Sequence, residues 1–143
     1  MDKVFLKRIQ VYQATAIFSV IFALVGFSYN VWRMEISEEN NNIRTAAFEM
    51  LKELADLEQL VYVAHYDGDE KEGSPRKGWV SVGLINELSI LAGDNVQMRA
   101  QSLHEIWSKH WSSMPTEMDS VNAIIESIEQ VRIEIRGVLI SLE

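Results

Sequence analysis

Residues 121–142, VNAIIESIEQVRIEIRGVLISL, carry the most regular apolar pattern in the chain. The aliphatic residues that recur there at alternating intervals of three and four are Val121, Ile124, Ile128, Val131, Ile135, Val138 and Leu142. These intervals place side chains on one face of an α-helix, and charged residues fill many of the positions between them. The stretch therefore predicts an amphipathic helix whose apolar face packs against other helices.

Two earlier segments have the same kind of pattern. The heptad positions of the first are Ile36, Asn40, Ile43, Ala47, Met50, Leu54, Leu57, Val61 and Ala64. The apolar face of the second consists of Leu84, Ile85, Leu88, Leu91 and Ala92, followed after Gly93 by Val96, Ala100, Leu103, Trp107 and His110. We expect helices over about 33–66, 79–111 and 116–143, with a kink or short break near Gly93.

Three long amphipathic helices joined by short turns favour one architecture. We expect an all-α protein in which residues 33–143 form an antiparallel three-helix bundle with coiled-coil-like packing. Residues 67–78 would form the turn at one end of this bundle, and residues 112–116 the turn at the other.

Residues 9–32 contain no charged side chain. As a helix these 24 residues would be about 36 Å long, enough to cross a hydrocarbon core of about 30 Å. Tyr12 lies near one end of the segment, and Tyr29 and Trp32 lie near the other, where aromatic rings favour the lipid–water boundary. The segment predicts a single transmembrane helix that continues into the bundle. A cleaved signal peptide is the competing interpretation, but the apolar run is longer than is usual for one.

The flanking charges predict the orientation of this segment. Lys3, Lys7 and Arg8 precede it, whereas Arg33 follows it and then come the acidic residues Glu35, Glu38 and Glu39. By the positive-inside rule, residues 1–8 are a cytoplasmic stub and residues 33–143 lie outside the cytoplasm. We expect a single-pass protein anchored in the inner membrane by an uncleaved signal anchor, with a periplasmic domain if the source is bacterial.

Small side chains form a stripe along the apolar segment. They are Ala16, Ser19, Ala23 and Gly26, with Asn30 one step further. Small residues on one face let two membrane helices approach closely, so the stripe favours self-association of the chain. Chance is the alternative, because these residue types are common in membrane helices.

The expected bundle places the 112–116 turn next to the membrane. Trp107, Trp111 and Met114 would then lie close to the lipid surface. Trp107 falls on the apolar face and is expected in the core. Trp111 is expected at the membrane interface.

The loop sequence HYDGDEKEGSPRKGW, residues 65–79, combines acidic residues with turn formers. The acids are Asp67, Asp69, Glu70 and Glu72, which are candidate ligands for a weakly bound divalent cation. An EF-hand is excluded, because Lys71, Glu72 and Gly78 stand at positions five, six and twelve of that pattern. The alternative is a solvated turn that meets a partner through Asp67, Asp69, Arg76 and Lys77.

Motifs for catalysis are missing from the sequence. The chain has no cysteine, no G-x-S-x-G nucleophile and no phosphate-binding glycine loop. The zinc-protease pattern fails as well, because Ser108 stands where the second histidine should follow His104 and Glu105. We therefore expect no enzyme activity and no cofactor.

Charge narrows the range of partners. The net charge is −8, and residues 33–143 contain 20 acidic and 10 basic side chains, a net charge of −10. Nucleic acid is therefore not an expected partner, whereas the lipid bilayer, a cationic or neutral protein and a second copy of the chain are.

These patterns favour a membrane-anchored interaction or scaffold protein, a subunit or accessory of an envelope complex. The alternative is an extracytoplasmic sensor-like module that binds a ligand or divalent ion and acts through a partner. In architecture alone, the chain resembles chemoreceptor-type sensor domains.

Overall fold

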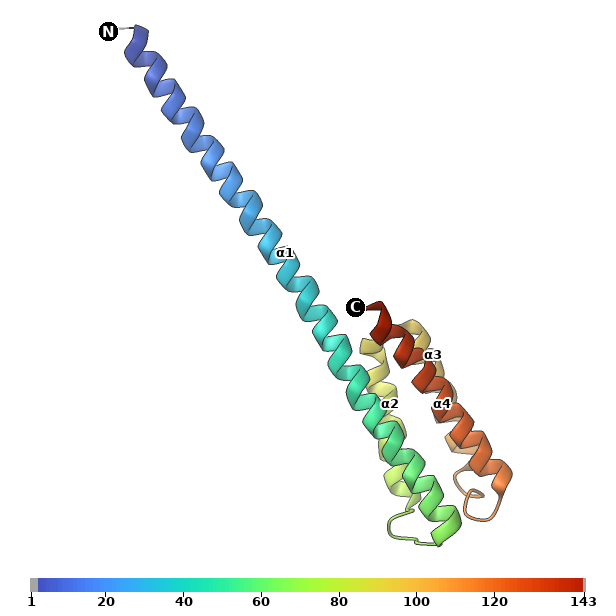
Figure 1. Cartoon of the computed structure of the whole chain (residues 1–143). Coiled ribbons are helices and arrows are strands. Elements are labelled where there is room, and N and C mark those ends of the chain that lie inside the picture. Colours follow the sequence, from blue (N-terminus) through green and yellow to red (C-terminus); the bar gives the residue numbers. More distant parts are fainter. Residues whose placement is uncertain (1–2, 143) are drawn as a thin grey trace. The chain divides into compact units, whose positions relative to one another are not determined.

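The computed structural model describes residues 3–142, with side chains from Lys7 onward, and contains four helices and no strand in that range (Figure 1). The elements are α1 (Lys3–Tyr62), a π-helical turn η1 (Val63–Asp67), α2 (Pro75–Ala92), α3 (Asp94–His110) and α4 (Met118–Ser141). The expected all-α class is confirmed.

The chain divides into two compact units. Unit 1 is Met1–Glu39 and unit 2 is Asn40–Glu143. Within unit 1, α1 includes a stretch long and apolar enough to cross a membrane. Every side chain of residues 7–39 is exposed, so the apolar residues of this unit have no cover from the chain itself.

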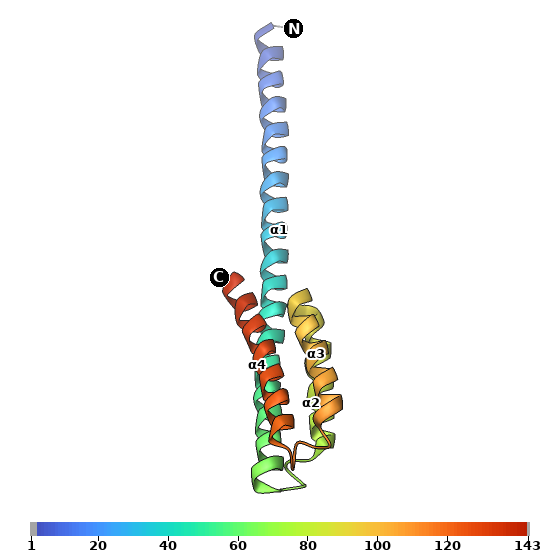
Figure 2. The ribbon, with the colours of Figure 1, turned by 90° about the vertical axis from the view of Figure 1, so that its right-hand side faces the viewer.

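Unit 2 surrounds one apolar core to which all four helices contribute (Figures 1 and 2). The largest fully buried side chains are Met50, Leu54 and Leu57 on α1, Ile85 on α2, Leu103 and Trp107 on α3, Met114, and Ile124, Ile128 and Ile135 on α4. The apolar faces predicted for α1 from Ala47 onward and for α4 are therefore the buried ones. Ile36, at the start of the first pattern, is exposed instead.

The break expected near Gly93 is present, but the expectation that residues 79–111 continue in one direction across it was wrong. Gly93 ends α2 and precedes α3 with φ 108° and ψ 164°, a conformation that side-chain-bearing residues rarely adopt. α2 and α3 lie side by side, and the chain reverses direction between them (Figures 1 and 2). The site of the expected kink or short break is therefore a turn between two helices.

The start of α2 also lies earlier than expected. Pro75 is its first residue, and Ser74 precedes it in an extended conformation. Proline suits the first helical position because its missing N–H would have no partner there and its φ is already helical. Residues 75–78, predicted as loop, are the first turn of this helix.

Because of the extra turn, both long loops of unit 2 lie at the same end. The His65 Nδ1 atom lies 2.8 Å from the Met114 carbonyl oxygen, which joins the end of η1 to the turn after α3. At the other end, an Arg44 guanidinium nitrogen lies 3.5 Å from the Leu142 carbonyl oxygen. We call these the loop end and the Asn40 end of unit 2. The expected separation of the two turns to opposite ends was wrong.

That correction removes the reason for expecting Trp111 at a membrane interface. Trp111 follows α3 at the loop end, partly buried against the core. Trp107 is fully buried, as expected. Its ring meets Trp79 edge to face, with ring centres 6.3 Å apart.

Candidate interaction surface

Asp69 organises the loop between η1 and α2. Its Oδ1 atom accepts hydrogen bonds from the backbone N–H groups of Lys71 and Glu72, at 2.8 and 3.0 Å. Gly68, before it, adopts a left-handed conformation with φ 62°. The hydrogen bonds from Glu72 and Lys71 lower the pKa of Asp69, because they stabilise the charged carboxylate. The loop is therefore a defined turn around one aspartate.

The four candidate cation ligands do not converge. Asp69 is turned toward its own backbone, and Glu72 forms an ion pair of 2.8 Å with Lys77. Among the side chains described, those of residues 7–142, no three of the metal-binding types lie close enough to hold an ion. The hypothesis of a divalent cation at Asp67, Asp69, Glu70 and Glu72 therefore finds no coordinating geometry.

The four residues expected to face a partner are exposed at the loop end. Asp67 closes η1, Asp69 forms the turn, and Arg76 and Lys77 lie in the first turn of α2. Only Lys77 of the two cations has an ion-pair partner among the described residues. The surface therefore presents both signs of charge.

Polar contacts that the sequence did not reveal hold the turn between α3 and α4. The His65 Nδ1–H donates to the Met114 carbonyl oxygen. The Ser120 hydroxyl lies 3.0 Å from His110 Nδ1 and 2.8 Å from the Ser113 hydroxyl oxygen. The contact of His65 with Met114 joins residues 49 positions apart, and the contacts of Ser120 span the turn between two helices, so no helical periodicity could have indicated them. They hold η1, the turn after α3 and the first turn of α4 together at the loop end.

Exposed aromatic side chains on α1 and η1 lie beside the turn between α3 and α4. The rings of Tyr62 and Tyr66 lie 6.1 Å apart, and the Tyr66 hydroxyl reaches the sulfur of Met118 at 3.7 Å. Next to them is an open groove of about 420 Å³. Its lining residues are Ala55, Glu58, Gln59, Tyr62, Val63, Tyr66 and Asp67. We call this the tyrosine groove.

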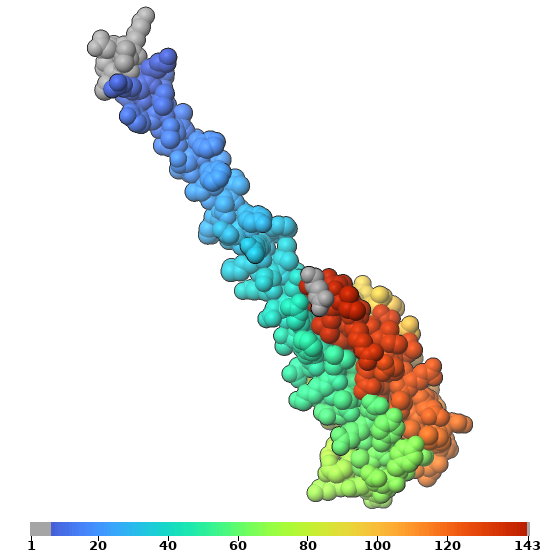
Figure 3. All heavy atoms as spheres, in the orientation of Figure 1, coloured from blue at the N-terminus to red at the C-terminus, as the bar shows by residue number. Residues whose placement is uncertain are grey.

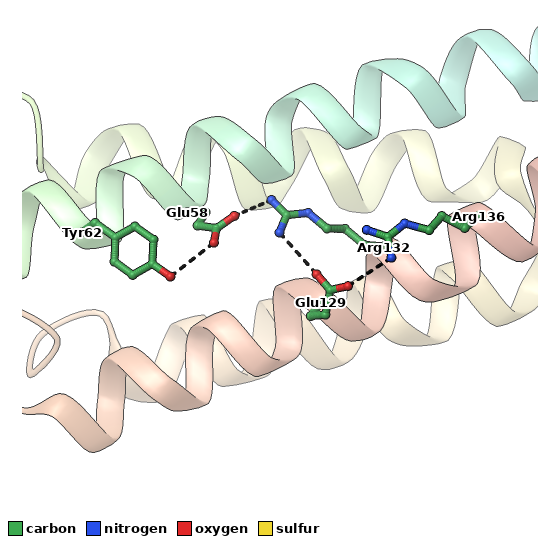
Figure 4. Close-up of polar contacts among 5 residues, drawn as sticks. All are labelled: Glu58, Tyr62, Glu129, Arg132 and Arg136. Atoms are coloured by element: carbon green, nitrogen blue, oxygen red, sulfur yellow. Dashed lines mark hydrogen bonds and ion pairs between the residues drawn. The ribbon is translucent and has the colours of Figure 1, made fainter.

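An ion-pair network connects the tyrosine groove to α4 (Figure 4). Arg132 donates to Glu58 at 2.5 Å and to Glu129 at 3.4 Å, and Arg136 donates to Glu129 at 3.3 Å. The Tyr62 hydroxyl donates to the other oxygen of Glu58 at 3.3 Å. α1 and α4 lie side by side on this face of unit 2 (Figure 3).

The network shifts the ionisation of two of its members. Burial alone would lower the pKa of Arg132, but its hydrogen bond to Glu58 and the charges of Glu58 and Glu129 raise it. Partial burial and the nearby Glu58 carboxylate raise the pKa of Tyr62. Arg132 therefore stays charged and Tyr62 stays neutral. Both side chains keep the protons that they donate to the Glu58 carboxylate.

In unit 1 the small residues Ala16, Ser19, Ala23 and Gly26 are exposed, and no other part of the described chain packs against them. The Ser19 hydroxyl donates to the Thr15 carbonyl oxygen at 2.8 Å, so it is satisfied within its own helix. A side chain added at Gly26 would meet no atom within 4 Å. Ala16 and Ala23 are likewise exposed.

The aromatic residues expected at the membrane interface are exposed too. They are Tyr12 toward one end of the apolar segment and Tyr29 and Trp32 at the other, where the two rings lie 6.2 Å apart.

No family model, curated protein or solved structure shows a significant match to this chain.

Proposed function

We propose that this chain is a single-pass, membrane-anchored helical interaction protein, a subunit or accessory of an inner-membrane complex. The observation that carries the proposal is the exposure of residues 9–32, a charge-free segment in which even Phe18 and Phe22 are covered by nothing in the chain. A core helix of a water-soluble protein would be buried. Bilayer lipid can cover such a surface, and a helix satisfies its own backbone hydrogen bonds there.

The expected topology is part of the proposal. The cations before the segment favour a cytoplasmic N-terminus, and unit 2 then lies in the periplasm. The chain should stay in the membrane pellet after alkaline carbonate extraction, and a reporter active only in the periplasm, fused after residue 143, should be active.

Charged substitutions in the apolar segment test the anchor. Replacing Phe18 and Phe22 together with aspartate should release the chain from the membrane, because each charge at a helix centre costs about 2.5–3.5 kcal/mol of insertion free energy. Replacing both with leucine is the matched control and should leave the chain anchored. Extraction of the unchanged chain by carbonate, or an intact but inactive reporter fusion, would contradict the anchor or its orientation respectively.

The tyrosine groove is the surface that we propose for the protein partner. Tyrosine combines apolar area with a polar group and is enriched among residues that dominate binding energy. Asp67 places an acidic group beside the Tyr62 and Tyr66 rings, whereas Glu58 is already paired with Arg132. Aromatic faces and this carboxylate together favour arginine or lysine, through cation–π contacts and charge attraction. The partner therefore presents a basic segment.

Crosslinking in native membranes tests this assignment. A photo-reactive residue at Gln59 should capture one protein, and replacing Tyr62 and Tyr66 with alanine should reduce that capture at least tenfold. Phe48→Ala is the matched control, because Phe48 is an exposed aromatic residue on the same helix outside the groove. Capture should also weaken as salt increases. Equal capture by the double variant and by Phe48→Ala would refute the groove as the docking site.

A further inference from the structure

A half-open cavity of about 550 Å³ lies at the loop end, where η1, the loop after it, the start of α2 and the turn between α3 and α4 meet. We call it the loop cavity. Its volume falls in the range of about 300–1,000 Å³ that is typical of small-molecule sites. It shares no lining residue with the tyrosine groove. The loop cavity is therefore a separate candidate site within unit 2.

The walls of the loop cavity are held in place by the fold. The Gly73 N–H donates to the Asp69 carbonyl oxygen at 2.8 Å, and a Cβ atom at Gly73 would lie 2.7 Å from the Cα atom of Ala64. The loop therefore packs directly against η1. Pro75 and Pro115, the two prolines of the chain, also line the cavity. Because proline fixes its own φ, these residues add rigid apolar surface.

The polar side chains of the loop cavity offer hydrogen-bond acceptors. The His65 Nδ1–H donates to the Met114 carbonyl oxygen, so the neutral imidazole has only Nε2 left for a ligand, and that atom is an acceptor. Asp69 accepts its two backbone hydrogen bonds through Oδ1, and the described residues donate none to Oδ2. Glu70 forms no ion pair with the described residues. A ligand here must therefore supply the donors.

The charges around the loop cavity indicate the sign of the ligand. Among the described residues, two carboxylates and no lysine or arginine line it. Lys77 pairs with Glu72, and both line a different hollow between α1 and α2. An organic cation suits these acceptors better than a metal ion, because among the described side chains no three lie close enough to coordinate one ion. An ammonium group satisfies carboxylates through charge-assisted N–H donors instead.

We propose that the loop cavity binds a small organic cation, an amine with an apolar body. Its ammonium group contacts Asp69 and Glu70 and donates to His65 Nε2, and its apolar part lies against Pro75 and Pro115. The inference goes beyond the interaction function proposed above and rests neither on the membrane anchor nor on the tyrosine groove. The π-helical turn η1 lies beside the cavity, and π-helical turns are frequent at functional sites.

Titration of the isotope-labelled full chain in dodecyl maltoside tests the proposal. Benzylamine is the probe, and benzyl alcohol, which has the same ring without the charge, is its matched control. The amide NMR signals of Gly68 and Gly73 report on the cavity. Benzylamine should move them saturably with a Kd on the order of 1 mM, as expected of a fragment-sized ligand. Benzyl alcohol should bind about tenfold more weakly, because it lacks the charge-assisted hydrogen bonds.

Two glutamates of the same loop provide matched variants. Glu70→Gln should weaken benzylamine about three- to fivefold, the loss expected for one exposed charge pair. Glu72→Gln changes the net charge equally, but Glu72 does not line the loop cavity, so it should leave the Kd nearly unchanged. His65→Asn keeps an N–H donor for the Met114 carbonyl and lacks Nε2, so it should weaken binding about threefold. The other amide signals should stay in place in both glutamine variants, since both glutamates are exposed.

Four results would overturn the inference. Equal affinity for benzylamine and benzyl alcohol would mean that charge is not recognised. Equal losses in Glu70→Gln and Glu72→Gln would reduce the effect to general attraction by an acidic loop. Loss of binding in Tyr62→Ala, with Glu70→Gln unaffected, would place the amine in the tyrosine groove. Calcium chloride that saturates the same signals and displaces benzylamine would make the loop cavity an inorganic cation site.

Discussion

Gly78 allows the first turn of α2 to approach the buried Trp107. A Cβ atom at Gly78 would lie 2.2 Å from Cζ2 and 2.3 Å from Cη2 of that ring. Because Trp107 is fully buried, its ring has little room to move. Gly78→Ala should lower the free energy of unfolding by about 1–3 kcal/mol, measured by urea denaturation in mild detergent.

Gly83 provides the matched control on the same helix. A Cβ atom there would meet nothing within 4 Å, so Gly83→Ala lacks the clash and gains the helix propensity of alanine. It should raise the free energy of unfolding by about 0.5–1 kcal/mol. Changes of the same sign in both variants would contradict the close approach of Gly78 to Trp107.

The charge of Asp69 makes the loop turn sensitive to acid. Its pKa lies below the ordinary value of 3.8, because the folded chain stabilises the carboxylate through two backbone N–H groups. The stabilisation is therefore complete above the ordinary pKa and is lost as the pH falls through the lowered value. In NMR spectra the amide signals of Lys71 and Glu72 should move with a midpoint below pH 3.8. Asp69→Asn keeps the acceptor and should remove that transition; a midpoint above 3.8 would contradict the turn.

At the scale of elements, apolar periodicity predicted most of the buried helix faces but not the direction in which each helix runs. Ile124, Ile128 and Ile135 are buried as their spacing required. The pattern after Gly93 also selected the buried face of α3, but two residues of the face predicted before Gly93, Leu84 and Leu91, are exposed. Periodicity is the same whichever way a helix runs, so it could not distinguish a kink at Gly93 from a reversal of the chain.

Turn chemistry held information that periodicity did not. Ser74 and Pro75 are a recognisable helix start, and they would have placed α2 correctly. In contrast, the contacts of His65 with Met114 and of Glu58 with Arg132 depend on which helices are neighbours. Once the reversal at Gly93 was missed, the loop end could not be assembled from sequence, whereas the tyrosine groove is lined by residues 55–67 alone and its spacing was open to prediction.

The contact between α1 and α4 depends in part on the Glu58–Arg132 pair. Their side chains are 25% and 17% exposed, so solvent screens this pair less than a surface pair. A double-mutant cycle with Glu58→Gln and Arg132→Met should give a coupling free energy of about 1–3 kcal/mol in urea unfolding.

The matched comparison is the Glu72–Lys77 pair, which joins the loop after η1 to the first turn of α2. Its side chains are 58% and 51% exposed, and its coupling should fall in the surface range of about 0.2–1 kcal/mol. Removing Arg132 alone should cost more than removing Glu58 alone, because it leaves Glu58 and Glu129 without their shared cation. Equal coupling in the two cycles would mean that the network adds nothing to α1–α4 packing.

At the scale of the whole molecule, the two units satisfy different physical requirements. Unit 1 exposes its apolar side chains and has none of its described side chains buried, whereas unit 2 has a closed core. The buried members of that core all lie between Ala47 and Ile135. The core therefore contains no residue of unit 1, and we expect unit 2 to fold without residues 1–39.

A chain of residues 40–143 should accordingly fold alone. We expect a helical circular dichroism spectrum and one cooperative thermal transition, because the fully buried side chains of all four helices are retained. Leu57→Ala in this shortened chain should lower the free energy of unfolding by about 2–5 kcal/mol, as expected for a cavity in a packed core. Phe48→Ala, at an exposed site on the same helix, should change it by less than about 0.5 kcal/mol. A shortened chain that unfolds gradually, while the full chain in detergent unfolds cooperatively, would show that unit 2 depends on residues 1–39 for its structure.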